Sequence, residues 1–274
     1  MYKINFKILK TYDTINKLES IGELTPNSLV KADCLEAMKY IASNSIDLIL
    51  CDLPFGTTKC KWDSVISLTE LWAHYKRIIK KNGAIVLFGQ TPFDKVLGNS
   101  NLNWLKYEWI WEKTHATGFL NAKKMPMKAH ENILVFYQNP PKYYPQKSIG
   151  HKPVNSNVKK VDVTNKTEVY GKVKNEYIIG GNTDRYPRSV LLFPSDKQTS
   201  KSSGFMHPTQ KPIALIEYLI KTYSDEGDVV LDNTMGSGTC PLGCVKLNRQ
   251  IIGIEKEEIY YKMTIDRIDD YLKN

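Results

Sequence analysis

Short apolar runs alternate with segments of helical spacing along most of this chain, and this alternation is the strongest constraint on its fold. The run Ile46-Asp47-Leu48-Ile49-Leu50-Cys51 is typical. Such a run predicts a strand buried on both faces, as parallel strands are. Strands that alternate with helices predict an α/β fold with a mostly parallel sheet. The expected strands cover residues 28–32, 46–51, 84–88, 107–112, 132–137, 229–232 and 250–254, and the expected helices cover 35–42, 68–79, 213–223, 239–247 and 260–271.

The alternation is interrupted between residues 140 and 205. Asn139-Pro140-Pro141 ends the preceding strand pattern, and the segment that follows is polar and rich in Lys, Tyr, Ser and Asn. Its length without a strong helix favours a functional or mobile insertion over a plain loop. We therefore expect one domain built from residues 1–139 and 206–274, with residues 140–205 inserted into it.

Composition narrows the class of protein. The chain has 274 residues, 42% of them hydrophobic, and a formal net charge of +9. A real core can form, and the positive charge favours nucleic acid as partner, although an indifferent basic surface would give the same count. The five cysteines form no C-x-x-C pair and the histidines are scattered, so we expect neither a disulfide framework nor a metal site. With no signal-peptide pattern and no apolar run of transmembrane length, we expect a cytoplasmic protein.

A glycine-rich turn joins the expected strand 229–232 to the helix after it. It reads Asp232-Asn233-Thr234-Met235-Gly236-Ser237-Gly238-Thr239. Gly236 and Gly238 can adopt positive φ and let a ligand approach the backbone. Glu255 ends the next strand, at about the offset where dinucleotide-binding folds place an acid on a ribose diol. The turn predicts a ligand that contains adenosine, and a tight turn without a ligand is the alternative.

The segment Asp52-Leu53-Pro54-Phe55 places a carboxylate, a rigid turn and an aromatic ring at the end of the strand 46–51. In open α/β sheets that edge faces the ligand. An amine on adenine or cytosine is a poor nucleophile because its lone pair is delocalised into the ring. Asp52 and a backbone carbonyl of the turn that Pro54 fixes could accept its N–H bonds, and Phe55 could stack on the base. A base in a duplex reaches such a pocket only after it is flipped out.

These segments together resemble the DNA amino-methyltransferases that use S-adenosylmethionine. Asp52-Leu53-Pro54-Phe55 is similar to their catalytic Asp-Pro-Pro-Tyr/Phe motif, and residues 232–239 are similar to their cofactor turn Asp-Pro-Phe-x-Gly-Ser-Gly-Thr. His207-Pro208-Thr209-Gln210-Lys211-Pro212 resembles the stretch that precedes that turn. The catalytic motif comes first, which is the permuted order of the beta class. The resemblance covers residues 28–139 and 206–270, and it implies a Rossmann-like, mostly parallel sheet with helices on both faces.

The resemblance also implies roles for single residues. Glu255 would bind the ribose of the cofactor. Lys211 would neutralise its methionine carboxylate or, alternatively, be a solvated loop lysine, which is the commoner case. Asp33 would face the adenine of the cofactor or, alternatively, cap the helix that begins near Leu35. An Asp at the first catalytic position is typical of adenine-N6 enzymes and a Ser of cytosine-N4 enzymes, so Asp52 implies adenine.

This copy departs from the family pattern in both motifs. Leu53 replaces the first Pro of the catalytic motif, and the cofactor turn has no aromatic ring before Gly236, where Met235 is the substitute. The implied catalytic residues are Asp52, Leu53, Pro54 and Phe55, and the implied cofactor-binding residues are Asp33, Lys211, Asp232, Met235, Gly236, Ser237, Gly238, Thr239 and Glu255.

Three basic stretches are candidates for DNA contacts. The loop 57–63 follows the catalytic motif, residues 123–130 form a second stretch, and the insertion interleaves basic and aromatic residues as groove readers do. The resemblance places target recognition in the insertion, and each stretch could instead be a solvated face. The expected DNA-binding residues are Lys59, Lys61, Trp62, Lys123, Lys124, Arg185 and Arg188.

The sequence thus predicts a site-specific DNA methyltransferase that acts on N6 of a flipped-out adenine and needs no metal. Transfer to cytosine N4 or to RNA is the nearest alternative. A non-catalytic DNA-binding protein and a dinucleotide-dependent oxidoreductase are alternatives from other classes, although the turn lacks the full G-x-G-x-x-G spacing and the ending of a P-loop. The family often forms homodimers, so a homodimer is a candidate assembly.

Overall fold

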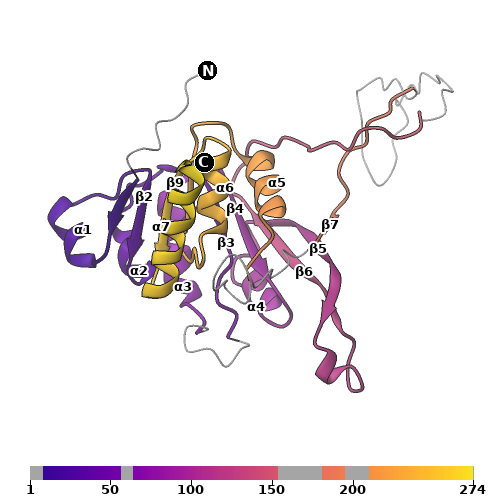
Figure 1. The fold of residues 1–274 in the computed structure, drawn as a ribbon, viewed down its shortest axis with the longest axis horizontal. Helices are drawn as coiled ribbons and strands as arrows, with labels where there is room; N and C mark the ends of the chain where they lie inside the picture. Colours follow the sequence, from indigo (N-terminus) through magenta and orange to yellow (C-terminus); the bar gives the residue numbers. More distant parts are fainter. Residues whose placement is uncertain (1–8, 57–63, 154–180, 195–209, 274) are drawn as a thin grey trace. The chain divides into compact units, whose positions relative to one another are not determined.

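The computed structural model describes residues 9–56, 64–153, 181–194 and 210–273, which contain one nine-stranded sheet (Figure 1). The strands are β1 Lys10–Tyr12, β2 Ser28–Lys31, β3 Ile46–Cys51, β4 Ile79–Gly89, β5 Leu105–Thr117, β6 Lys128–Phe136, β7 Val190–Phe193, β8 Val229–Asp232 and β9 Gln250–Glu255. Their order across the sheet is β1-β2-β9-β8-β3-β4-β6-β5-β7. The first six run parallel, β6 is antiparallel to β4 and β5, and β7 is parallel to β5. The expected mostly parallel α/β sheet is confirmed.

Helices cover both faces of this sheet (Figure 1). They are α1 Ile15–Ile21, α2 Cys34–Ala37, α3 Leu68–Ile78, α4 Phe93–Asn99, α5 Ile213–Tyr223, α6 Thr239–Lys246 and α7 Glu258–Lys273, with short 3-10 turns at Met38–Tyr40 and Phe119–Asn121. Side chains of α2, α3 and α4 form one buried cluster with Ile49 and Cys51 of β3. Those of α5 and α6 form another with Leu48 and Leu50. Because successive side chains of a strand point to opposite faces, the two helix groups lie on opposite sides of β3.

Strands from distant parts of the chain meet at the centre of the sheet. β3 pairs directly with β8, with Ile49 opposite Leu231, and β8 pairs with β9, with Asp232 opposite Gly253. Because these strands are parallel, the turns that follow them emerge at the same edge. The apolar residues of β3 and β8 therefore position the two candidate motifs side by side.

Several elements differ from the sequence expectation. β4 begins at Ile79, directly after α3, and continues through Asn82-Gly83, which we expected to separate helix from strand. Ile79 pairs with Ile46 of β3, and this pairing overrides a weak turn signal. The short elements β1, α1 and α4 were not expected. Neither was β7, which lies within the range expected for the insertion and pairs with β5.

Residues 145–188 form a compact unit, and residues 1–144 and 189–274 form the other. In the described part of the smaller unit, Ser148 and Arg185 form an antiparallel bridge. The guanidinium of Arg185 donates to three backbone carbonyls, those of Asn182, Asp184 and Lys152. The strand-like piece expected at 176–179 lies outside the described residues.

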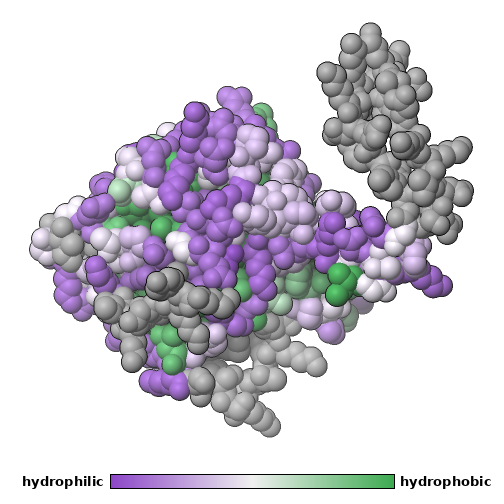
Figure 2. Space-filling model, turned by 90° about the horizontal axis from the view of Figure 1, so that it is seen from above, coloured by the Kyte–Doolittle hydropathy of each residue, from purple (hydrophilic) through white to green (hydrophobic). Residues whose placement is uncertain are grey.

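The face of the molecule drawn in Figure 2 is mostly hydrophilic, with apolar side chains in small patches. In the described ranges, no helix combines the length and the apolar character that spanning a membrane requires.

Candidate active site

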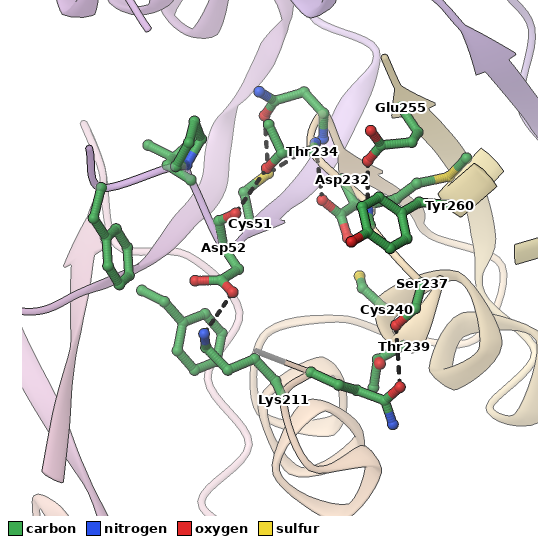
Figure 3. A pocket seen from close by; sticks show the side chains of 18 of the residues that line it. Cys51, Asp52, Lys211, Asp232, Thr234, Ser237, Thr239, Cys240, Glu255 and Tyr260 are labelled. Atoms are coloured by element: carbon green, nitrogen blue, oxygen red, sulfur yellow. Dashed lines mark hydrogen bonds and ion pairs between the residues drawn. The ribbon is translucent and has the colours of Figure 1, made fainter. Parts of the chain in front are cut away.

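A cavity of about 700 Å³ lies where β2, β3, β8 and β9 end (Figure 3). Its wall includes the turns after these four strands and side chains from β4, β5 and β6. Figure 3 shows Asp232, Glu255 and Tyr260 toward one end and Asp52 with Lys211 toward the other. The predicted residues that line the cavity are Asp33, Asp52, Leu53, Pro54, Phe55, Lys211, Asp232, Met235, Gly236, Ser237, Thr239 and Glu255.

Backbone donors hold Glu255 at its end of the cavity. Its Oε2 accepts the N–H of Gly236 at 2.8 Å, and its Oε1 accepts the N–H of Glu257 at 2.8 Å. Burial raises the pKa of this carboxyl, while the backbone donors oppose the rise. Each carboxylate oxygen keeps a further lone pair, so Glu255 can also accept hydrogen bonds from hydroxyl groups of a ligand.

Asp232 lies beside Glu255 and is 4% exposed. One of its oxygens accepts the N–H of Thr234 at 3.2 Å. Burial raises the pKa of Asp232 to about 8, and the nearby carboxylates of Asp52 and Glu255 contribute. A cation in the cavity would relieve this crowding of negative charge and lower the pKa again. This end of the cavity therefore favours a ligand with hydroxyl groups and a positive charge.

The two glycines of the turn have different surroundings. Both have positive φ, 52° at Gly236 and 80° at Gly238. Gly236 lines the cavity and donates to Glu255. A Cβ at Gly238, however, would lie 2.6 Å from the side chain of Thr264 in α7. The absence of a side chain at Gly238 therefore allows helix α7 to pack close to the backbone of the turn. Gly238 is the one predicted cofactor-binding residue that does not line the cavity.

Asp33 combines a structural contact with a place on the cavity wall. It is the N-cap of α2, where its Oδ1 accepts the N–H of Leu35 at 2.9 Å. The capping alternative from the sequence is confirmed. Contact with the adenine of a cofactor stays a prediction.

Four charged side chains, alternately acidic and basic, connect the predicted catalytic motif to the hairpin strands β5 and β6. They are Asp52, Lys211, Glu131 and Lys113, and we call them the charge chain. Lys211 Nζ lies 2.5 Å from Asp52 Oδ2 and 3.3 Å from Glu131 Oε2. Glu131 Oε1 accepts a hydrogen bond from Lys113 Nζ at 2.5 Å. The last three side chains are at most 10% exposed. Two carboxylates and two ammonium groups balance, which limits the cost of burying them.

The charged groups of the charge chain change the pKa values of their neighbours. Burial opposes ionisation of Glu131, yet the ammonium groups of Lys211 and Lys113 lower its pKa. Burial also opposes the charge of Lys211, yet Asp52 and Glu131 raise its pKa. Burial raises the pKa of Asp52, although Lys211 opposes the rise. Burial therefore favours the protonated form of Asp52, whereas the neighbouring lysines favour the ionised form of Glu131.

One oxygen of Asp52 is left open. Oδ2 is occupied by Lys211, whereas Oδ1 is buried and accepts no hydrogen bond from any described residue. Leaving a buried acceptor without a donor costs roughly 1–3 kcal/mol. Because Asp52 lines the cavity, its Oδ1 is a candidate acceptor for a ligand N–H or O–H. The backbone carbonyl of Asp52 accepts the hydroxyl of Thr234 at 3.0 Å, which ties the catalytic turn to the glycine turn.

Phe55 provides an aromatic surface on the cavity wall near Lys211. Its ring stacks on Phe93, with centroids 5.2 Å apart and an interplanar angle of 28°. Lys211 Nζ lies 5.7 Å from the centroid of Phe55 and 5.2 Å from that of Phe88. Leu53, in contrast, is 3% exposed and packs in the core cluster, so it anchors the turn.

Sequence reasoning missed Glu131 and Lys113. β6 runs antiparallel to β4, with Asn132 opposite Gly89, so the start of β6 lies at the edge where the parallel strands end. The signal in the sequence is a charged residue directly before the apolar strand 132–137. That signal becomes informative only once the direction of β6 is known.

The predicted DNA-binding residues that the structure describes come from both compact units. Lys59, Lys61 and Trp62 lie outside the described residues. Lys123 and Lys124 are exposed near the tip of the β5–β6 hairpin, and Arg188 is exposed in the smaller unit. Within the described ranges, no group of three or more His, Cys, Asp and Glu side chains is arranged to hold a metal ion.

Comparison with known proteins agrees with this site. Residues 46–266 match a family model described as DNA methylase. Type II methyltransferase M.HpaI of Haemophilus parainfluenzae is 31% identical over 255 residues, which cover 88% of this chain and 74% of that protein. DNA adenine methyltransferase YhdJ of Escherichia coli is 28% identical over 262 residues, which cover 88% of this chain and 82% of YhdJ.

Two solved structures share the fold. The M1.HpyAVI–SAM complex is 23% identical, with a TM-score of 0.56 over 87% of this chain and 98% of its own. PvuII DNA methyltransferase (cytosine-N4-specific) is 15% identical, with a TM-score of 0.59 over 92% of this chain and 93% of its own.

Proposed function

This chain belongs to the family of DNA methylases, and from that premise we propose that it methylates N6 of a flipped-out adenine in DNA, with S-adenosylmethionine as the donor. The unpaired Oδ1 of Asp52 carries the proposal, because it can accept an N–H bond of a primary amine on a heterocycle. The name of YhdJ, a DNA adenine methyltransferase, supports adenine as the base.

In this proposal Asp52 both activates the amine and takes its proton. Oδ1 accepts one N–H bond of the amine, and a carbonyl of the Leu53–Pro54 turn accepts the other, so the nitrogen lone pair is drawn out of the ring. As the nitrogen gains its methyl group, it loses a proton to Asp52, whose pKa burial has raised. Lys211 holds Oδ2 throughout and fixes the orientation of the carboxylate.

The residues at the other end of the cavity fit S-adenosylmethionine. When bound, this cofactor supplies a methyl group on a positively charged sulfur. Glu255 can accept the ribose hydroxyl groups, and the positive charge of the cofactor would favour the ionised form of Asp232, whose pKa burial raises to about 8. Lys211 is already shared by two acids, so we assign it to Asp52 and not to the methionine carboxylate.

DNA would be held around the mouth of the cavity. We propose that Phe55 stacks on the flipped base and that Lys123 and Lys124 contact phosphates. The smaller unit, with Arg188, is proposed to contribute to target recognition. Its Arg185 has a structural task, since its guanidinium joins backbone carbonyls within that unit. Lys59, Lys61 and Trp62 remain predicted contacts, and a homodimer remains a candidate assembly.

Cytosine N4 is the second candidate. The same acceptors fit its amine, and a neighbour with this fold is named as cytosine-N4-specific.

The test is to identify the product. Plasmid DNA is incubated with the protein and S-adenosylmethionine, digested to nucleosides and analysed by mass spectrometry, with Asp52→Ala as the control. We expect N6-methyladenine with the native protein alone, and sequencing that detects modified bases gives the site. N4-methylcytosine would replace the proposal with the second candidate. Absence of any methylated nucleoside, while S-adenosylhomocysteine and DNA both bind, would contradict methyl transfer.

A further inference from the structure

The tip of the β5–β6 hairpin exposes two large apolar side chains. The hairpin ends in the turn Phe119–Asn121, and Figure 1 shows it projecting from the sheet. Phe119 is 78% exposed and Leu120 is 98% exposed. Gly118 has a φ of 90° and turns the chain so that both side chains stand at the apex. Such exposure of neighbouring apolar side chains marks an interaction surface.

The same hairpin forms part of the cavity wall. The residues of β5 that line the cavity are Trp111, Lys113, His115, Ala116 and Thr117. Thr117 is two residues before Phe119, a span of at most about 7 Å between Cα atoms. The apolar apex therefore lies close to the cavity that would receive a flipped base.

The surroundings of the apex are positively charged. Residues 115–130 contain Lys123, Lys124 and Lys128 and no acidic residue. All three lysines are exposed. An apolar apex between exposed lysines suits duplex DNA, where cations contact phosphates and an apolar side chain enters the base stack.

We propose that Phe119 and Leu120 form a wedge that enters the stack beside the target base and favours its flipped-out state. The proposal rests on the proposed function, because a wedge is needed only if the target lies in a duplex. Extruding a base opens a gap in the stack, and a phenyl or isobutyl group can fill it. The wedge lowers the cost of extrusion and leaves the chemistry at Asp52 unchanged.

The experiment compares two substrates that carry the recognition site found by sequencing. In one, thymine is opposite the target adenine; in the other, an abasic site is opposite it, so the target is already unpaired. The variants are Phe119→Ala combined with Leu120→Ala, Phe119→Trp, and the matched control Leu102→Ala, whose side chain is 61% exposed elsewhere. Calorimetry with S-adenosylhomocysteine confirms that each variant is folded.

We expect the double variant to methylate the paired duplex at least about tenfold more slowly. On the abasic duplex it should remain within about threefold of the native protein, since little extrusion remains to be done. Phe119→Trp and Leu102→Ala should behave like the native protein on both.

Equal losses on both substrates, or no loss on either, would overturn the wedge. So would a native dimer that the double variant converts to a monomer in sedimentation, because the apex would then join two copies. If the native protein methylates neither substrate, the proposed function itself fails.

Discussion

The two ends of the cavity hold their acids in different ways. Glu255 and Asp232 accept backbone N–H groups, whereas Asp52 and Glu131 share the ammonium group of Lys211. The position of a backbone N–H donor is fixed by the turn that contains it, and this donor does not change its charge with pH. A lysine brings a full charge that must be balanced by other side chains. The cofactor end is therefore specified locally, and the end around Asp52 depends on distant segments meeting correctly.

The largest expected effect separates the two ends directly. Asp52→Ala removes the open acceptor, and we expect methyl transfer to fall by about a thousandfold. Affinity for S-adenosylhomocysteine should stay unchanged, because the backbone-held end is intact. Tritiated methyl transfer and calorimetry measure the two quantities. Robust transfer by this variant would remove Asp52 from the mechanism.

The next prediction tests the charge chain. Glu131→Gln leaves Lys113 and Lys211 with one acid between them, so we expect a loss of stability of about 3 kcal/mol and a kcat lower by about 10–100-fold. Adding Lys113→Met restores the balance of charge, and the double variant should be more stable than Glu131→Gln alone. Chemical denaturation and steady-state kinetics measure these effects.

The pH profile shows whether Glu131 acts through Asp52. The charge of Glu131 raises the pKa of Asp52, and Asp52 must be ionised to accept the amine. Removing that charge lowers the pKa of Asp52, so the acidic limb of the kcat profile should move to lower pH in Glu131→Gln. If the acidic limb of the kcat profile does not move, Glu131 has only a structural role.

A smaller effect is expected at the cofactor end. Glu255→Gln removes a charged acceptor, so S-adenosylhomocysteine should bind about tenfold more weakly. At saturating cofactor kcat should change little, the reverse of the result for Asp52→Ala. Calorimetry and kinetics across cofactor concentrations test this. A loss of kcat without a loss of affinity would mean that the two ends are not separable.

The smallest expected effect is the release of a proton when the cofactor binds. Because the pKa of Asp232 is about 8, this carboxyl is mostly protonated at pH 7. A cationic ligand favours the ionised form, so binding of S-adenosylmethionine should release up to about one proton, and affinity should rise with pH until about pH 8. Calorimetry in buffers of different ionisation enthalpy measures the release. Asp232→Asn should abolish it, and an unchanged release would assign the proton to another group.

The same contrast explains what the sequence could predict. Asp232, Gly236 and Glu255 belong to a strand, a turn and the next strand, so their spacing alone indicated a site. Lys113 and Glu131 come from β5 and β6, and no local pattern places them near Asp52. Local spacing also could not distinguish Gly236 from Gly238, because the neighbour of Gly238 is Thr264 in a helix further along the chain.

Two of the short helices and strands were harder to predict from the sequence than the long ones. α4 and β7 have seven and four residues, and both lie in segments where no helix or strand was expected. β7 is the apolar run Val190–Phe193, which pairs with β5 and lies inside the range expected for the insertion.

The pairing of β3 with β8 has a consequence for the synthesis of this protein. Asp52 and Thr234 are hydrogen-bonded although 182 residues separate them. A growing chain that has left the ribosome as far as residue 144 already contains the whole catalytic turn, but it lacks Lys211, β8 and β9. Until those segments emerge, β3 has no partner on one side and Asp52 has no lysine. A chain that ends at residue 144 therefore lacks the contacts from Lys211 and Thr234 that hold Asp52 in the folded protein.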